Sequence, residues 1–287
     1  MDHLGSGRLP ERQHGPVTGG PHLIEPGPGE RGAPLIGAAR RRVLVEVFAL
    51  WLVTLLGIRA VVALQSVGLP DWTLAAVPFL FIYAPVGLCA WRGVDSFAYR
   101  LALPALSDRA AWREGLTVGL LGAVLLLLPW LPAYHAFQNV VHWALHAMRT
   151  GEWSFELTDL WMRTWPRWRV PREAWLLVPY HLFFVAIPEE LFYRGYLQTR
   201  LNEVWPRRYV AFGAAWGPGL LLATAMFAFG HSLVAFQWWH FATFFPGLVF
   251  AWMRERTGQP LAGAVFHMAC NVIVVWMDTF YGIRPAA

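Results

Sequence analysis

The sequence predicts an all-α fold, a polytopic transmembrane helical bundle of seven or eight spans. Of its 287 residues, 56% are hydrophobic and 14% are charged, whereas an ordinary soluble domain carries about 25% charged residues. The mean hydropathy is +0.40, and the chain contains 17 tryptophans. This composition is typical of an integral membrane protein and argues against a soluble enzyme.

The basic residues account for the high isoelectric point of about 9.6. All 23 of them are arginine, and they are scattered between apolar runs instead of lining one face. This distribution indicates anchoring at a membrane surface, and we expect no nucleic-acid partner. Because the absence of lysine favours a GC-rich, bacterial genome, the predicted location is the bacterial inner (cell) membrane, with multiple passes.

The chain divides into three predicted parts. Residues 1–38 are rich in Gly and Pro and lack an apolar run, so we expect a disordered N-terminal tail. Residues 39–173 would form N-terminal transmembrane helices and an amphipathic segment, and residues 174–287 the helices that carry the chemistry. Arg40, Arg41 and Arg42 precede the first apolar run and favour a cytoplasmic N-terminus.

Seven apolar runs approach the ~20 residues that a helix needs to cross a bilayer. They cover residues 43–68, 72–91, 115–131, 175–201, 209–231, 237–253 and 261–280. Cys89 and Cys270 lie inside two of these runs, so neither a disulfide framework nor a cysteine zinc site is indicated.

One segment, from Ala133 to Met148, fits two interpretations. Its polar residues recur at helical spacing and form one stripe: His135, Gln138, Asn139, His142 and His146. The segment is either an amphipathic helix in the interface or an eighth span that lines a cavity. Arginines are expected on the cytoplasmic side, but their positions do not decide between seven and eight spans. Seven spans would place the arginine-rich 163–172 loop on the opposite side, and eight spans would do so for residues 200–208.

The segment Ile187–Arg194 places charges inside an apolar run. A charge at the centre of a bilayer costs about 3 kcal/mol on insertion scales, so such residues are usually paired or functional. Glu190 and Arg194 are four residues apart and share a helical face, which predicts an ion pair. Glu189 is rotated by about 100° from Glu190 and is left as the working carboxylate. The alternative is an ion-pair lock without chemistry.

Pro188 lies beside these acids and cannot donate a backbone hydrogen bond. We expect it to free a carbonyl about one turn earlier, to open the helix locally and to admit water.

Two further polar groups lie on later runs. His231 ends the fifth run, and His267 and Asn271 project from one face of the seventh, where both can donate to a single point. His231 and His267 reach one depth only if residues 232–240 are irregular or the helix breaks at 246–247. We expect the two histidines within about 12 Å of each other.

The three motifs together resemble the signature of the CPBP family, the CAAX proteases and bacteriocin-processing enzymes. They are Glu-Glu-x-x-x-Arg at 189–194, Phe-x-x-x-His at 227–231 and His-x-x-x-Asn at 267–271. Each motif alone is weak, but three in this order on successive apolar segments are specific. The resemblance covers roughly residues 174–280, and the family includes the eukaryotic CAAX prenyl endoprotease.

The resemblance implies an intramembrane endopeptidase. Glu189 would be the general base that activates water, assisted by His231. His267 and Asn271 would hold the oxyanion of the tetrahedral intermediate, where two preoriented donors are worth several kcal/mol. The residues that would organise the site are Glu190 and Arg194.

No cofactor is expected. The alternative is a zinc ion, for which Glu189, His231 and His267 would be the ligands. The chain has no His-Glu-x-x-His motif, and water activation by a carboxylate does not require a metal. The expected partners are the lipid bilayer and a membrane protein or lipid-anchored peptide as substrate, cleaved near its C-terminus.

Three other functions compete with this prediction. The first is a protease that processes C-terminal sorting signals, and the second is a non-catalytic immunity or scaffold protein with the same fold. The third is a proton- or ion-coupled transporter, but the sequence shows no related halves.

Overall fold

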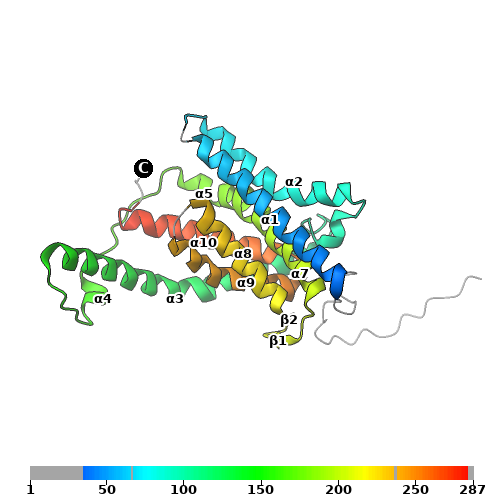
Figure 1. The fold of residues 1–287 in the computed structure, drawn as a ribbon. Helices are drawn as coiled ribbons and strands as arrows, with labels where there is room; N and C mark the ends of the chain where they lie inside the picture. The colour runs from blue at the N-terminus through cyan, green and yellow to red at the C-terminus, as the bar shows by residue number, and fades with distance from the viewer. Residues whose placement is uncertain (1–34, 66, 236–237, 284–287) are drawn as a thin grey trace, which may run out of the picture.

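The computed structural model describes residues 35–65, 67–235 and 238–283 and shows a helical bundle with one small hairpin (Figure 1). The predicted tail therefore lies outside the described residues except for residues 35–38, and the first helix begins at Gly37. The α-helices are α1 Gly37–Gln65, α2 Ala76–Trp91, α3 Arg109–Thr150, α4 Asp159–Met162, α5 Leu177–Tyr180, α6 Ile187–Glu190, α7 Gln198–Val204, α8 Pro218–Ala235, α9 Phe244–Thr257 and α10 Leu261–Phe280.

Short elements connect these helices. The 3-10 segments are η1 Asp71–Ala75, η2 Ser96–Tyr99, η3 Ala174–Leu176 and η6 Trp238–Thr243, and the π-helical segments are η4 His181–Ala186 and η5 Leu191–Leu197. The strands β1 Tyr209–Ala211 and β2 Ala214–Trp216 pair antiparallel.

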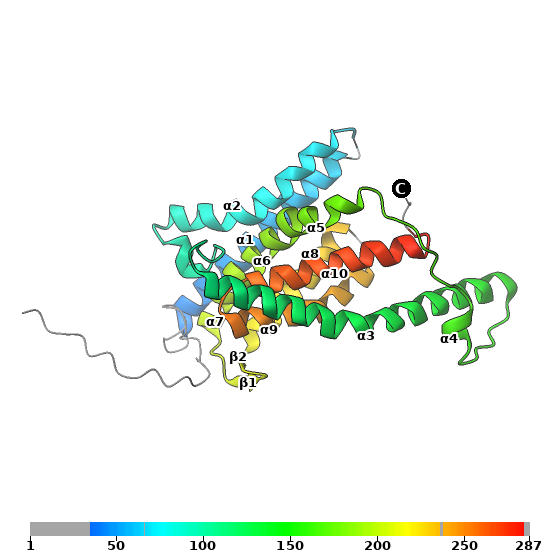
Figure 2. The ribbon, with the colours of Figure 1, turned by 180° about the vertical axis from the view of Figure 1, so that it is seen from behind.

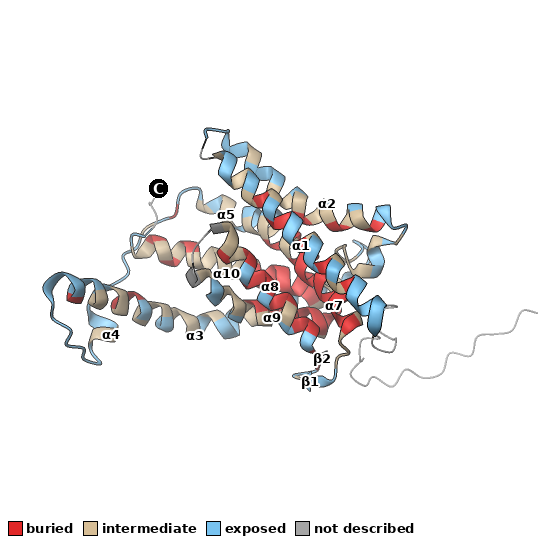
Figure 3. Ribbon diagram, viewed as in Figure 1, coloured by how far each residue is buried: buried red, intermediate tan, exposed pale blue. Residues whose placement is uncertain are grey.

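Five continuous helical stretches among the described residues are long and apolar enough to cross a membrane: 37–65, 71–91, 109–150, 174–204 and 261–280. A shorter apolar helix covers Pro218–Val234. Many large apolar side chains on α1, α2 and α3 are exposed, as expected of surfaces that face lipid (Figure 3). The protein is thus an all-α, multi-pass membrane protein, and the number of seven or eight spans stays a prediction.

The longest helix, α3, corrects the predicted boundary at residue 131. Asp108 caps its start by accepting a hydrogen bond from the backbone N–H of Ala111 at 3.0 Å, and Gly151 ends it with a φ of 79°. Pro129 and Pro132 remove two backbone donors without ending the helix. Residues 133–148 therefore continue the third helix without a break and do not form a helix of their own.

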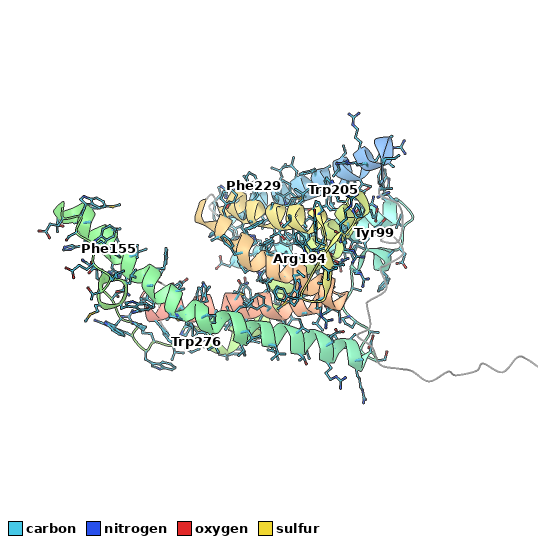
Figure 4. All side chains as sticks on the ribbon, turned by 90° about the horizontal axis from the view of Figure 1, so that it is seen from below. Tyr99, Phe155, Arg194, Trp205, Phe229 and Trp276 are labelled. Carbon is cyan, nitrogen blue, oxygen red and sulfur yellow. The ribbon has the colours of Figure 1, made fainter. Side chains whose placement is uncertain are left out.

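The length of α3 exceeds the thickness of a bilayer. Its 42 residues give about 63 Å at the rise of an α-helix, about twice the hydrocarbon thickness. Figure 1 shows its second half, with α4, extending beyond the bundle as an arm. From below, Phe155 marks the far end of this arm (Figure 4).

The polar stripe of α3 binds the chain segment that returns along the arm. Oδ1 of Asn139 accepts hydrogen bonds from the backbone N–H groups of Arg163 at 2.7 Å and Thr164 at 2.8 Å. Nε2 of His135 lies 3.1 Å from the carbonyl oxygen of Trp161. The stripe therefore orders residues 161–164.

The predicted fifth run, residues 209–231, begins differently from the prediction. Its first residues form the β1–β2 hairpin, whose two-residue turn has φ values of 50° at Phe212 and 78° at Gly213. Positive φ at both positions is typical of tight hairpin turns. The helix α8 starts only at Pro218.

The irregularity predicted around residues 232–240 is present in part. The helix α8 continues to Ala235, a 3-10 segment covers 238–243, and α9 begins at Phe244, just before Pro246. A short α9 after a 3-10 segment replaces the long sixth helix predicted from Gln237 to Met253.

The helix that carries the two glutamates is also irregular. Two π-helical segments, 181–186 and 191–197, flank the single α-helical turn Ile187–Glu190. Pro188 lacks the N–H that would close a regular turn, and π-segments inside α-helices occur frequently at functional sites. The local opening predicted at Pro188 therefore takes the form of a widened helix.

Contacts define the two ends of the bundle. Arg207 pairs with Glu255 at 2.8 Å, so residues 200–208 lie beside the turn from α9 to α10. Arg40 lies over the ring of Trp205 at 5.1 Å, at the same end. At the other end of α10, about 30 Å away, the backbone N–H of Arg167 donates to the carbonyl of Phe280 at 2.9 Å. The 163–172 loop therefore lies opposite Arg40–Arg42.

One core joins the N-terminal and C-terminal helices (Figure 2, Figure 3). Trp51 of α1 donates through Nε1 to the carbonyl of Met226 in α8 at 3.2 Å, and Arg59 donates to the carbonyl of Val234 at 2.9 Å. Phe81 of α2 packs against the ring of Phe192, with centroids 5.4 Å apart. This core encloses the glutamate-bearing helix on several sides.

Candidate active site

The carboxylate of Glu189 lies where three helices meet. Its Oε2 is 3.7 Å from Nε2 of His231 on α8 and 4.0 Å from Nε2 of His267 on α10. Because the two distances share one oxygen, the two Nε2 atoms are closer than the predicted limit of about 12 Å. The predicted meeting of the motifs is therefore confirmed for these three residues.

The predicted ion pair between Glu190 and Arg194 is present and enclosed. Nη1 of Arg194 is 3.3 Å from Oε1 of Glu190, and both side chains have no exposed surface. Nη2 donates to the carbonyl of Gly247 at 3.1 Å, and the guanidinium lies 4.3 Å from the ring centroid of Phe227. Figure 4 shows Arg194 in the interior of the bundle.

A backbone contact orients His231. Its Nδ1 is 3.0 Å from the carbonyl oxygen of Phe227, one turn earlier. A carbonyl oxygen only accepts, so Nδ1 carries the proton of this bond, and in the neutral ring Nε2 keeps its lone pair. That lone pair is on the nitrogen nearest Glu189, where it can accept a hydrogen bond from water.

His267 is held from three sides. Its Nδ1 is 3.3 Å from Oε1 of Glu190, and its ring stacks on Phe250 with centroids 4.7 Å apart and planes at 17°. The ring of Phe227 meets it edge-on at 5.7 Å. These contacts direct Nε2 towards Glu189.

Asn271 lies one helical turn after His267 on α10 and is half-buried. The four-residue spacing places the two side chains on one helical face, as the sequence predicts. Its part in the site stays a prediction.

Exposure falls from one side of the site to the other. The side chain of His231 is 29% exposed, that of Glu189 is 12% exposed and that of Glu190 is fully enclosed. The more exposed side of the site is therefore the side of His231.

Several residues that shape the site were not predicted. Phe227 belongs to a quoted motif, but its contact with Arg194 and both histidines has no signal in the sequence. Phe250 and Gly263 are also absent from the prediction. A Cβ at Gly263 would lie 2.9 Å from Oε2 of Glu190, so only glycine lets α10 approach the acid this closely. In the sequence, Phe227 and Phe250 are indistinguishable from ordinary core residues, and only the fold shows which side chains they contact.

The remaining histidines near the site have other contacts. His181 packs against Tyr180 with ring centroids 5.3 Å apart. Nδ1 of His240 lies 3.4 Å from the carbonyl oxygen of His231. His240 thus contacts the backbone of a predicted catalytic residue. Cys89 is buried, Cys270 is half-buried, and both are free thiols.

The alternative zinc ligands fit the metal in type and partly in position. Two imidazole nitrogens and a carboxylate are a known zinc set, and both histidines bond an acceptor through the other ring nitrogen, as zinc-binding histidines do. In the described part of the chain, however, no group of three His, Cys, Asp or Glu side chains is spaced to hold a metal ion. Zinc would require these ligands to move closer together.

The fold and the site define a multi-pass membrane protein with a carboxylate–histidine centre inside its bundle. Residues 171–273 match the family model described as Type II CAAX prenyl endopeptidase Rce1-like. This segment contains all three motifs, and the match confirms the resemblance to the CAAX proteases of the CPBP family, which are peptidases. No curated protein and no solved structure matches the chain.

Proposed function

We propose that this protein is an intramembrane endopeptidase that hydrolyses a peptide bond with a water activated by Glu189. The observation that carries the proposal is the convergence of both Nε2 atoms, of His231 and His267, on one carboxylate oxygen of Glu189. The match to a peptidase family over the same residues supports it. An ion-pair lock would need only Glu190 and Arg194.

In the proposed reaction, a water molecule lies between Glu189 and His231. Glu189 takes one proton from this water, and Nε2 of His231 accepts a hydrogen bond from the other O–H of the same water. The water oxygen then attacks the substrate carbonyl carbon. Glu189 then gives the proton to the amine nitrogen as the carbon–nitrogen bond breaks. The products are a carboxylic acid and an amine, so the atoms of one water are consumed.

The oxyanion of the intermediate would be held by His267 and Asn271. Removing one such donor in other hydrolases lowers kcat by about 10²–10³-fold. Nδ1 of His267 already contacts Glu190, so Nε2 can donate only if the ring carries two protons or Glu190 carries one. Glu190 therefore governs the donor that faces the substrate, which gives the Glu190–Arg194 pair its supporting role.

The proposed substrate is a membrane protein or a lipid-anchored peptide, cleaved near its C-terminus at a bacterial inner membrane. A site inside a bundle of membrane helices reaches segments that lie in or at the bilayer. The partial exposure of His231 provides the side from which such a segment would enter.

The test compares the termini of membrane proteins by mass spectrometry in cells that carry the wild type, Glu189→Gln or His231→Gln. We expect both variants to accumulate in the membrane and to lose the same set of cleaved termini. Glu114→Gln is the matched control, because the side chain of Glu114 is 42% exposed and lies outside the site. Identical termini in Glu189→Gln and wild type would support the non-catalytic immunity or scaffold protein instead.

A second arm addresses the metal. We propose that the reaction is metal-free, so the purified protein should keep its activity after treatment with a zinc chelator. If the chelator abolishes cleavage and added zinc restores it, Glu189, His231 and His267 become the ligands, and the hydrolytic function itself stands.

A further inference from the structure

A groove between α1 and α2 combines an arginine cluster with an apolar floor. Its volume is about 840 Å³, and none of its lining residues belongs to the candidate active site. Arg41, Arg42 and Arg92 line one end, and Val45, Ala49 and Leu88 line the rest. Charge at one end and hydrocarbon along the remainder is the pattern of a phospholipid.

The dimensions of the groove agree with one leaflet of a bilayer. Its lining on α1 runs from Ala38 to Val53, and Arg42 lies about 16 Å from Val53 along the helix axis. Half of the hydrocarbon core is about 15 Å thick. Trp91, which is 84% exposed, also lines the arginine end, and tryptophans are enriched at the level of the headgroups.

The charges at this end favour an anion. Glu46 also lines the groove, but Arg92 and Arg200 both pair with it, and Tyr196 donates to it at 2.5 Å. Glu203 pairs with Arg200 in turn. Among the residues that line the groove, Arg41, Arg42 and Arg92 against Glu46 leave a net charge of +2.

We propose that this groove binds one anionic phospholipid, with its phosphate against Arg41, Arg42 and Arg92 and an acyl chain along Val45, Ala49 and Leu88. Basic pockets between transmembrane helices are known to bind anionic headgroups. A zwitterionic lipid fits the apolar floor equally well but gains less at the arginine end. The site is separate from the proposed peptidase reaction, and its test does not depend on activity.

The experiment uses the purified full-length protein, stripped of lipid in detergent, and counts bound lipid by native mass spectrometry. Phosphatidylglycerol, phosphatidylcholine and inorganic phosphate are titrated separately. We expect a one-to-one complex with phosphatidylglycerol, clearly weaker binding of phosphatidylcholine and none of phosphate alone. Equal binding of the two lipids, or saturable binding of phosphate alone, would overturn the proposal.

Two variants separate the parts of the site. Arg41→Gln with Arg42→Gln should weaken phosphatidylglycerol binding on the order of 30-fold, since each basic residue near an anionic surface contributes a factor of about five. Ala49→Trp should also weaken binding, because it fills the apolar floor and leaves every charge in place. Ala49 is exposed, so this variant should still fold, and thermal unfolding checks that it does.

The matched control is Arg109→Gln with Arg113→Gln, which removes two exposed arginines from the start of α3. This control should bind phosphatidylglycerol like the wild type. If it loses as much binding as the Arg41 and Arg42 variant, the effect is general surface charge and the groove is not a lipid site.

Discussion

At the scale of single residues, the most constrained group is the guanidinium of Arg194. It has no exposed surface, and it faces Glu190, the carbonyl of Gly247 and the faces of Phe227 and Phe250. Its charge is thus balanced by one carboxylate and by ring faces, which attract cations. Removing one partner of a buried ion pair leaves the other charge without compensation.

We therefore expect Arg194→Met to lower the free energy of unfolding by about 3–5 kcal/mol, measured by denaturant titration in detergent. The double variant Glu190→Gln with Arg194→Met should recover part of this loss, because it leaves no unpaired charge. Arg256→Gln is the control: its ion pair with Glu114 has side chains 40% and 42% exposed, and its loss should cost less than about 1 kcal/mol.

If Arg194→Met proves as stable as Arg256→Gln, the buried ion pair contributes no more to stability than an exposed one, and Glu190 and Arg194 do not organise the site as proposed.

The spacing of four residues between Glu190 and Arg194 was enough to predict this ion pair. The ring contacts of Arg194 come from residues 227 and 250, and no local pattern connects them to residue 194.

At the scale of helices, the packing of α3 against α10 fixes the depth of His267 and Asn271. Gly115 and Gly119 of α3 let the two helices approach closely, as small residues do in membranes. A Cβ at Gly119 would lie 2.7 Å from Cβ of Val265 and 2.8 Å from the carbonyl oxygen of Ala262. One of these neighbours is backbone, so the helices themselves would have to separate.

Gly119→Ala should lower the free energy of unfolding by about 1–3 kcal/mol, the usual cost of overpacking, and should reduce cleavage by shifting α10. Gly87→Ala is the matched control, since a Cβ there meets nothing within 4 Å. Thermal unfolding in detergent compares the two. A variant at Gly119 that unfolds at the same temperature as Gly87→Ala would show that the close approach is not required.

Element boundaries were predictable only where a strong signal ends a helix. The run 261–280 matches α10 at both ends, because Pro260 precedes it and Tyr281-Gly282 follows it. The end predicted for α3 at residue 131 was wrong, since Pro129 and Pro132 are tolerated inside that helix. The β1–β2 hairpin was missed because its apolar residues, such as Tyr209 and Val210, continue the hydrophobic run.

At the scale of the whole molecule, the sequence indicated the class of fold and the meeting of three distant motifs. It left the orientation of the second half undecided, because counting arginines supports neither seven nor eight spans. The structure adds information that hydropathy lacks: α3 is continuous, and contacts such as Arg207 with Glu255 assign loops to ends. Arg163–Arg172 then lie at the end opposite Arg40–Arg42.

This arrangement predicts the sides from which single cysteines can be labelled. In a background with Cys89 and Cys270 changed to alanine, Arg109→Cys and Arg208→Cys should react with a membrane-impermeant maleimide from the same side. Both positions are exposed, and Gln259, at the α9–α10 turn, donates to the carbonyl of Ala111 at 2.9 Å. Arg172 is also exposed. A cysteine at this position should react only from the opposite side, because α3 carries the chain across the membrane once between residues 109 and 150.

An eighth span within residues 133–148 would instead bring Arg172→Cys to the side of Arg109→Cys. Labelling of intact cells against inverted vesicles distinguishes the two arrangements, and equal labelling of Arg109→Cys and Arg172→Cys from one side would contradict a single crossing by α3.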